Sequence, residues 1–232
     1  MVDFTGDEEV LKRLEAPVAG LKAKLYTDAI EKSDYKPLTE HKNEGLMTSA
    51  PVQYVCRAGN FRRKGLPYRG SLKVLKVMMG YEYLWVNVRV KGGAYGCMCS
   101  FGKSGDCYFT SYRDPNLGKT VEVYEEASDF IRNFTADERV MTQYIIGAIS
   151  ELDMPMNPSA KGLHSLGAYM VGLDDAFLQR ERDQVLSATQ EDIRGLAAYI
   201  DAFMEEDCLC VVGNAQKVKG EEKLFGNIEN LF

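Results

Sequence analysis

The segment Arg89-Val-Lys-Gly-Gly-Ala-Tyr-Gly96 places a permanent charge and a phenol on either side of two glycines. Glycine tolerates sharp backbone turns, so Gly92 and Gly93 can reverse the chain here. Arg89 supplies a fixed set of donors, and Tyr95 can donate a hydrogen bond to a developing oxyanion. A helix that ends at the glycines, with its arginine in water, explains the same residues. The residues alone therefore leave a binding role and a structural role open.

The residues after this segment predict a β-hairpin. Two apolar stretches, 95–101 and 107–112, flank the turn sequence Gly102-Lys-Ser-Gly105, and this pattern is typical of two antiparallel strands. The residues before the segment are ambiguous, because 83–90 fit both strand alternation and helical spacing. Further upstream, apolar residues alternate over 52–56 and predict another strand.

Helical spacing and caps cover much of the remaining chain. Thr135-Ala-Asp-Glu138 and Thr189-Gln-Glu-Asp192 both match a capping box. Residues 209–212 are interpreted as the last strand, and residues 33–49 as a loop. The stretches with helical spacing are 7–33, 72–79, 116–134, 135–148, 160–186 and 193–203.

This order of elements predicts the fold class. A hairpin together with clustered helices favours an α+β fold with an antiparallel sheet over a regular βαβ alternation. We place a helical connecting segment at residues 1–45 and a single α+β domain at residues 46–232.

Composition excludes several classes of protein. The 232 residues are 45% hydrophobic, as in ordinary globular proteins. A net charge of −6 argues against broad nucleic-acid binding. No apolar run approaches the ~18 residues of a membrane span, and residues 1–9 lack the features of a secretory signal. We therefore expect a cytoplasmic protein that binds neither nucleic acid nor membranes.

Six cysteines include two Cys-x-Cys pairs, at positions 97 and 99 and at positions 208 and 210. In a strand this spacing puts both sulfurs on one face. Their neighbours are apolar, and zinc sites usually carry Cys-x-x-Cys on a turn. We expect small buried side chains in a reducing cytosol rather than a metal or redox site.

The charged side chains offer no catalytic set. His41 begins a His-x-x-Glu sequence, but Gly45 stands where an inverted zinc motif needs its second histidine. His164 lies in an apolar helical stretch and is interpreted as structural. A basic cluster, Arg57 with residues 62–64, is interpreted as a solvated loop or, less favourably, as a site for an acidic ligand. We assign no catalytic residue, metal ligand or cofactor to this chain.

Four segments together resemble a known family. These are Arg89–Gly96, Ser111-Tyr-Arg-Asp-Pro-Asn116, Leu186–Arg194 and Val211-Val-Gly-Asn214. They are similar to the presequence-protease branch of the pitrilysin/insulinase zinc metallopeptidases, and the similarity runs through the whole chain. Those enzymes contain four similar α+β domains, and this chain resembles the last of them.

The resemblance implies a fold for this chain and a location of the catalytic residues in another domain of the enzyme. The fold would be the pitrilysin/insulinase, or mitochondrial processing peptidase-like, domain, with helices mainly on one face of an antiparallel sheet. Residues 82–90 would then be helical. The zinc ligands and general base of the family lie in its first domain, so zinc would belong to the parent enzyme and this chain would be inactive alone.

The resemblance also implies substrate contacts. Family members use an arginine and a tyrosine of the C-terminal half to contact the peptide beside the scissile bond. Arg89 and Tyr95 match this pair, and Gly92 and Gly93 would allow the approach. The expected partners are a peptide substrate and the N-terminal catalytic half, and an isolated domain is expected to self-associate through its docking face. The alternative is a catalytically inactive scaffold or peptide-binding protein of the same fold.

Overall fold

The computed structural model describes residues 2–26, 28–29, 31, 34, 36 and 42–231. The chain divides into two compact units, one made of residues 1–39 and 153–179, and the other of residues 40–152 and 180–232. The predicted domain boundary at residue 45 stays a prediction. Within the described residues, no helix is long and apolar enough to cross a membrane.

The first unit is helical. Helix α1 spans Glu8–Lys22, and residues 23–26 are not helical, so the helix predicted over 7–33 is too long; positions 27, 30, 32 and 33 of that prediction lie outside the described residues. Helix α6 spans Pro158–Met170 and is capped by Asn157, whose side chain accepts a hydrogen bond from the Ala160 amide. The predicted single helix over 160–186 is wrong, because α6 ends before Gly172, which has φ +71°. A second helix, α7 (Asp175–Leu186), then begins and continues into the other unit.

The second unit contains a six-stranded sheet in the order β3-β4-β2-β5-β1-β6. The ladders β3–β4, β4–β2 and β2–β5 are antiparallel, whereas β1 pairs in parallel with both β5 and β6. The sheet is therefore mixed, not antiparallel throughout as predicted, because β1 runs parallel to both of its neighbours. The strands are β1 (Glu44–Thr48), β2 (Gln53–Asn60), β3 (Gly96–Phe101), β4 (Asp106–Asp114), β5 (Cys208–Asn214) and β6 (Asn227–Asn230).

The predicted hairpin is confirmed as β3 and β4. In its turn the Gly102 amide donates to the Asp106 carbonyl at 2.7 Å, and Gly105 has φ +96°. Two strand predictions are wrong. Strand β1 lies in the stretch predicted as a loop, and β5 is followed by another strand, β6.

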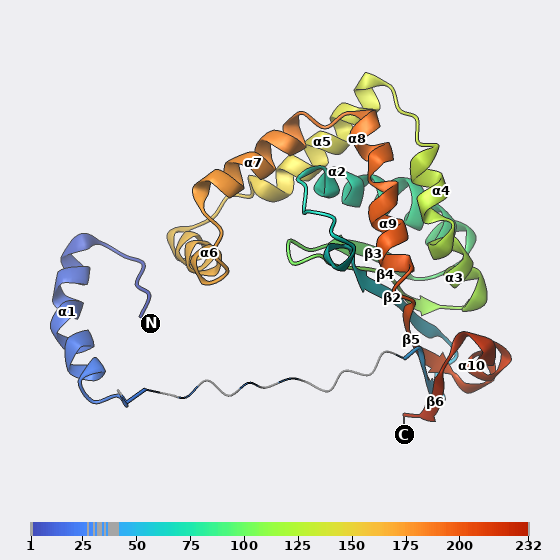
Figure 1. The fold of residues 1–232 in the computed structure, drawn as a ribbon, viewed down its shortest axis with the longest axis horizontal. Helices are drawn as coiled ribbons and strands as arrows, with labels where there is room; N and C mark the ends of the chain where they lie inside the picture. The colour runs from blue at the N-terminus through green and yellow to red at the C-terminus, as the bar shows by residue number, and fades with distance from the viewer. Residues whose placement is uncertain are drawn as a thin grey trace. The chain divides into compact units, whose positions relative to one another are not determined.

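Helices cover one face of the sheet, as Figure 1 shows for α2, α3, α4, α8 and α9. Along β2, β4 and β5 the inward residues Val55, Phe109 and Val211 are fully buried, and Phe109 packs edge-to-face on Phe203 of α9. The α+β class with helices mainly on one face is thus confirmed. The helices are α2 (Ser71–Met78), α3 (Gly118–Glu125), α4 (Ala127–Arg132), α5 (Glu138–Leu152), α8 (Gln190–Gly195), α9 (Ala197–Met204) and α10 (Ala215–Gly220), with 3₁₀ turns η1 (Phe61–Lys64) and η3 (Glu222–Leu224).

Helix α2 continues directly into η2 (Met79–Lys91), a π-helix of 13 residues. Residues 82–90 are therefore helical, as the resemblance implied. The π-helix is a rare geometry, found frequently at functional sites. Its C-terminal end carries Arg89 into the glycine turn.

Of the two predicted capping boxes, the second is confirmed. Thr189 and Asp192 cap α8 reciprocally, since the Thr189 amide donates to the Asp192 carboxylate at 2.9 Å. The first is wrong. Helix α5 begins at Glu138, and the carboxylate that accepts from its first turn belongs to Asp137, at 2.8 Å from the Val140 amide.

Candidate functional site

The glycine turn after η2 needs both of its glycines. The Gly93 amide donates to the Arg89 carbonyl at 2.9 Å, and Gly93 has φ +81°, a conformation that side chains rarely adopt. A Cβ on Gly92 would lie 2.4 Å from the Val88 carbonyl oxygen. The two glycines therefore shape the backbone of the site.

The turn brings Arg89 and Tyr95 together. The Arg89 Nε donates to the Tyr95 carbonyl at 2.9 Å, and the guanidinium carbon lies 3.8 Å from the centre of the Trp85 ring. Tyr95 is 61% exposed, and among the described residues its hydroxyl has no hydrogen-bond partner. The site thus presents a positioned guanidinium beside a phenol that is free to donate.

Strand β4 supplies two further side chains at this site. The Tyr112 ring meets the Tyr95 ring edge-on, with centroids 5.6 Å apart. The Arg113 guanidinium lies 5.6 Å from the Tyr95 centroid, and Arg113 adopts φ +48°, which is uncommon for a residue with a side chain. Neither Tyr112 nor Arg113 was assigned a role from the sequence, although both belong to the 111–116 segment.

A buried carboxylate fixes the end of β4. Asp114 is fully buried. Its Oδ2 accepts from the hydroxyls of Ser111 and Thr120, each at 2.7 Å, and its Oδ1 accepts from the Asn116 amide at 2.8 Å. Because a buried charge is costly without partners, these three hydrogen bonds hold the backbone of this turn in one conformation.

The end of β4 is hydrogen-bonded to the glycine-containing segment 89–96. The Asn116 side-chain amide donates to the Gly92 carbonyl at 2.5 Å, and the Tyr95 amide donates to the Arg113 carbonyl at 3.3 Å. The segments 89–96 and 111–116 are separate in the sequence, but these hydrogen bonds join them around Tyr95.

The basic cluster at 57–64 is balanced by an acidic segment at 205–207. Arg57 pairs with Asp207 at 2.5 Å, Arg63 with Glu206 at 3.0 Å, and Lys64 with Glu205 at 2.9 Å. The hydrogen bond and charge of Glu205 raise the pKa of Lys64. Sequence reasoning found the cations but not these acids, which lie about 140 residues further along the chain.

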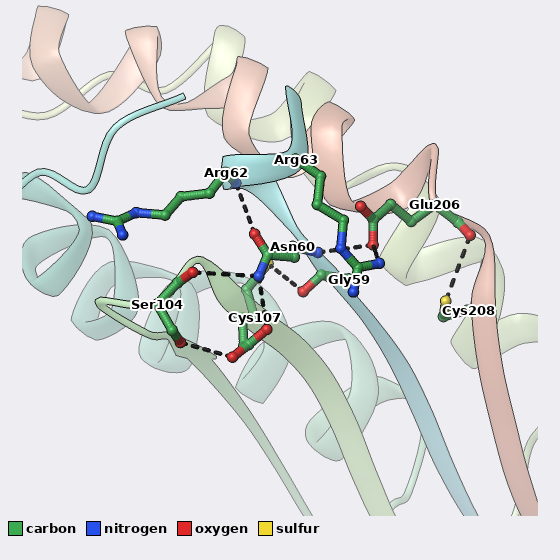
Figure 2. Close-up of polar contacts among 9 residues, drawn as sticks. Gly59, Asn60, Arg62, Arg63, Ser104, Cys107, Glu206 and Cys208 are labelled. Atoms are coloured by element: carbon green, nitrogen blue, oxygen red, sulfur yellow. Dashed lines mark hydrogen bonds and ion pairs between the residues drawn. The ribbon is translucent and has the colours of Figure 1, made fainter. Parts of the chain in front are cut away.

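Figure 2 shows how this cluster is tied to the hairpin. The Asn60 amide donates to Glu206 at 3.1 Å, while its side chain accepts from the Arg62 amide at 2.9 Å and donates to the Ser104 carbonyl at 3.3 Å. The Arg62 side chain extends away from Glu206 in this view. Because three of its four cations are paired with acidic side chains, the cluster keeps little of the net positive charge on which an acidic-ligand site would depend.

The described residues contain no group of three or more histidine, cysteine or carboxylate side chains placed to hold a metal. His164 is exposed on α6, and His41 lies outside the described residues. The cysteine prediction is wrong in part. Cys99 and Cys107 are buried, and burial raises the pKa of each thiol to about 12, but Cys56 is only half-buried and Cys210 is exposed.

Solved structures place the fold among peptidase domains. The M16 peptidase inactive domain from Pseudomonas fluorescens aligns over 88% of this chain and 51% of its own, with a TM-score of 0.61 and 16% identity. Pitrilysin aligns over 88% of this chain and 23% of its own, with a TM-score of 0.56 and 14% identity. The fold is therefore that of an M16, or pitrilysin/insulinase-type, peptidase domain.

Sequence comparison shows to which family of these peptidase domains the chain belongs. Residues 43–217 match the family described as the PreP C-terminal domain, and the chain belongs to that family. Protein HypA of Clostridium perfringens is 39% identical over 231 residues, which are 100% of this chain and 24% of that protein. Presequence protease 1 of Arabidopsis thaliana is 36% identical over 178 residues, 76% of this chain and 16% of that protein. The chain thus spans about a quarter or less of the length of these relatives.

Proposed function

We propose that this chain is the non-catalytic C-terminal domain of a zinc metalloendopeptidase that degrades unstructured peptides. In this proposal it forms part of a closed chamber around the peptide and supplies Arg89 and Tyr95 to the bound substrate. Membership of the PreP C-terminal domain family supports the placement. A cytoplasmic location and self-association of the isolated domain remain part of the proposal.

The main support for the proposal is that Tyr95 has an exposed phenol on a backbone held by hydrogen bonds. Its phenol is exposed and has no hydrogen-bond partner among the described residues, while its backbone is fixed by Arg89 on one side and Arg113 on the other. Because such a hydrogen-bond donor is in position before the substrate binds, little reorganisation energy is needed when charge develops on the substrate. Groups that stabilise a developing charge are preorganised in this way.

The proposed chemistry divides between two halves of the enzyme. In the parent enzyme a zinc ion, bound elsewhere, would polarise the scissile carbonyl and activate water. Arg89 would bind a peptide carbonyl beside the scissile bond and so fix the register of the substrate. Tyr95 would donate its hydroxyl proton as a hydrogen bond to the oxyanion of the tetrahedral intermediate. Because that charge is absent from the ground state, Tyr95 would act mainly on turnover.

The first prediction concerns the chain alone. We expect the isolated 232-residue chain to bind no stoichiometric zinc and to cleave no unstructured peptide, because the described residues hold no ligand set. Metal analysis after dialysis, together with a peptide-hydrolysis assay, measures both. The same chain joined to its N-terminal half should cleave the peptide and hold zinc.

Two results would contradict the proposal. Zinc-dependent cleavage by the isolated chain would place a catalytic site within it. A joined protein that binds zinc and peptide but never cleaves would support a scaffold or peptide-binding role instead.

A further inference from the structure

Two cysteines face each other on the side of the sheet that the helices leave open. Cys56 lies in β2 and Cys210 in β5, and the antiparallel register pairs them directly. Burial alternates along both strands, so that their neighbours Val55 and Val211 are fully buried while Cys210 is exposed. Both sulfurs therefore point away from the core.

This placement fits a disulfide. Directly opposed residues of antiparallel strands have Cα atoms about 4.5–5.5 Å apart. A disulfide needs a Cα separation of about 4.4–6.8 Å, so the usual spacing of directly opposed residues falls within the range for this bond. No other cysteines share this arrangement in the ladders that the structure describes, where Cys97 faces Ser111, Cys99 faces Phe109 and Cys208 faces Ala58.

We propose that Cys56 and Cys210 are a modification site, a cross-strand dithiol that a small-molecule disulfide converts to an intramolecular disulfide. The disulfide would cross-link β2 covalently to β5 in the centre of the sheet. This inference does not depend on the proposed peptidase role.

The reaction balances in two exchange steps. The thiolate of Cys210, the more exposed sulfur, attacks one sulfur of the small disulfide and releases one small thiol. The thiolate of Cys56 then attacks the Cys210 sulfur of the mixed disulfide and releases the second small thiol. The two protein thiols lose two electrons and two protons in total, and the small disulfide gains both.

The surroundings set the pH dependence. Burial raises the pKa of both thiols, and the Glu44 carboxylate, opposite Cys210 on β1, raises that of Cys210 further. A hydrogen bond from Thr110 partly offsets the rise at Cys56. Because only the thiolate attacks, the rate should increase about tenfold for each pH unit below the pKa.

The test treats the chain with oxidised glutathione and identifies the products by intact-mass measurement and peptide mapping. We expect one Cys56–Cys210 disulfide with no retained glutathione, formed faster at mildly alkaline pH. In Cys56→Ser the second step is blocked, so one glutathione should stay on Cys210. Cys97→Ser, a control on the edge strand β3, should form the same disulfide as the unchanged chain.

Three outcomes would overturn the proposal. The first is a glutathione that persists on Cys210 in the unchanged chain, which would mean that Cys56 cannot reach it. The second is a disulfide between any other two cysteines. The third is the absence of reaction even at mildly alkaline pH.

Discussion

Replacing Asp114 by alanine should lower the free energy of unfolding of the chain by about 3–5 kcal/mol, the range for breaking a buried charged network. The carboxylate is fully buried and accepts three hydrogen bonds, from Ser111, Asn116 and Thr120. Its removal leaves two buried hydroxyls without their acceptor and also leaves a cavity. Urea denaturation, followed by circular dichroism, measures the change.

The matched control is Asp106→Ala, at the other end of the same strand. Asp106 also accepts side-chain hydrogen bonds, from Asn60 and Ser104, but it is exposed. Its loss should cost about 0.5–1 kcal/mol. If the two substitutions lowered the free energy of unfolding equally, Asp114 would not be what holds segments 89–96 and 111–116 together around Tyr95.

Replacing Tyr95 by phenylalanine should lower kcat of the intact enzyme about 100-fold, with KM changed less than about twofold. The ring, its edge contact with Tyr112 and the backbone hydrogen bonds of Tyr95 all remain in this variant. Only the hydroxyl is lost, and the proposal assigns it to the charge that develops in the intermediate. Steady-state kinetics on an unstructured peptide separates the two constants.

Tyr81→Phe is the control for this experiment. Tyr81 lies in the same π-helix that carries Arg89, and it is 70% exposed. Its variant should keep both constants. If Tyr95→Phe raised KM and left kcat unchanged, Tyr95 would bind substrate and transition state equally, and the oxyanion role would be wrong.

Local sequence signals predicted much of the second unit. The hairpin was readable because a glycine-bounded turn separates two apolar stretches, and its register is now seen from Phe101–Cys107 to Gly96–Tyr112. The cap at Thr189 was predicted because both partners lie within one helical turn, although the same spacing at Thr135 predicted a capping box that does not form. The elements with the strongest local patterns were therefore the ones predicted.

Features that depend on distant partners were missed. Strand β1 (Glu44–Thr48) has a weak pattern of its own and is defined by its pairing with β5 and β6. The mixed character of the sheet follows from that pairing and has no local signature. Likewise, the acids that balance Arg57 and Arg63 lie at 205–207, and no short-range spacing connects them.

The candidate site shows the same division. The residue types of Arg89, Tyr95 and the two glycines left a binding role and a structural role open, and only the resemblance to the presequence-protease branch favoured binding. The sequence did not reveal that Asn116 holds the Gly92 carbonyl or that Arg113 lies over the Tyr95 ring. Those contacts depend on how β4 pairs with β3 and where it ends.

The proposed role of Tyr95 requires its side chain to contact the peptide in the proposed intact enzyme, and this contact can be tested by cross-linking. A photoreactive benzoyl-phenylalanine is placed at position 95 of the intact enzyme and, as a control, at position 81, which is at least as exposed. We predict that illumination in the presence of an unstructured peptide links the peptide at position 95 and not at position 81. Absence of a cross-link at position 95, in a preparation that binds the peptide, would show that Tyr95 does not contact the substrate.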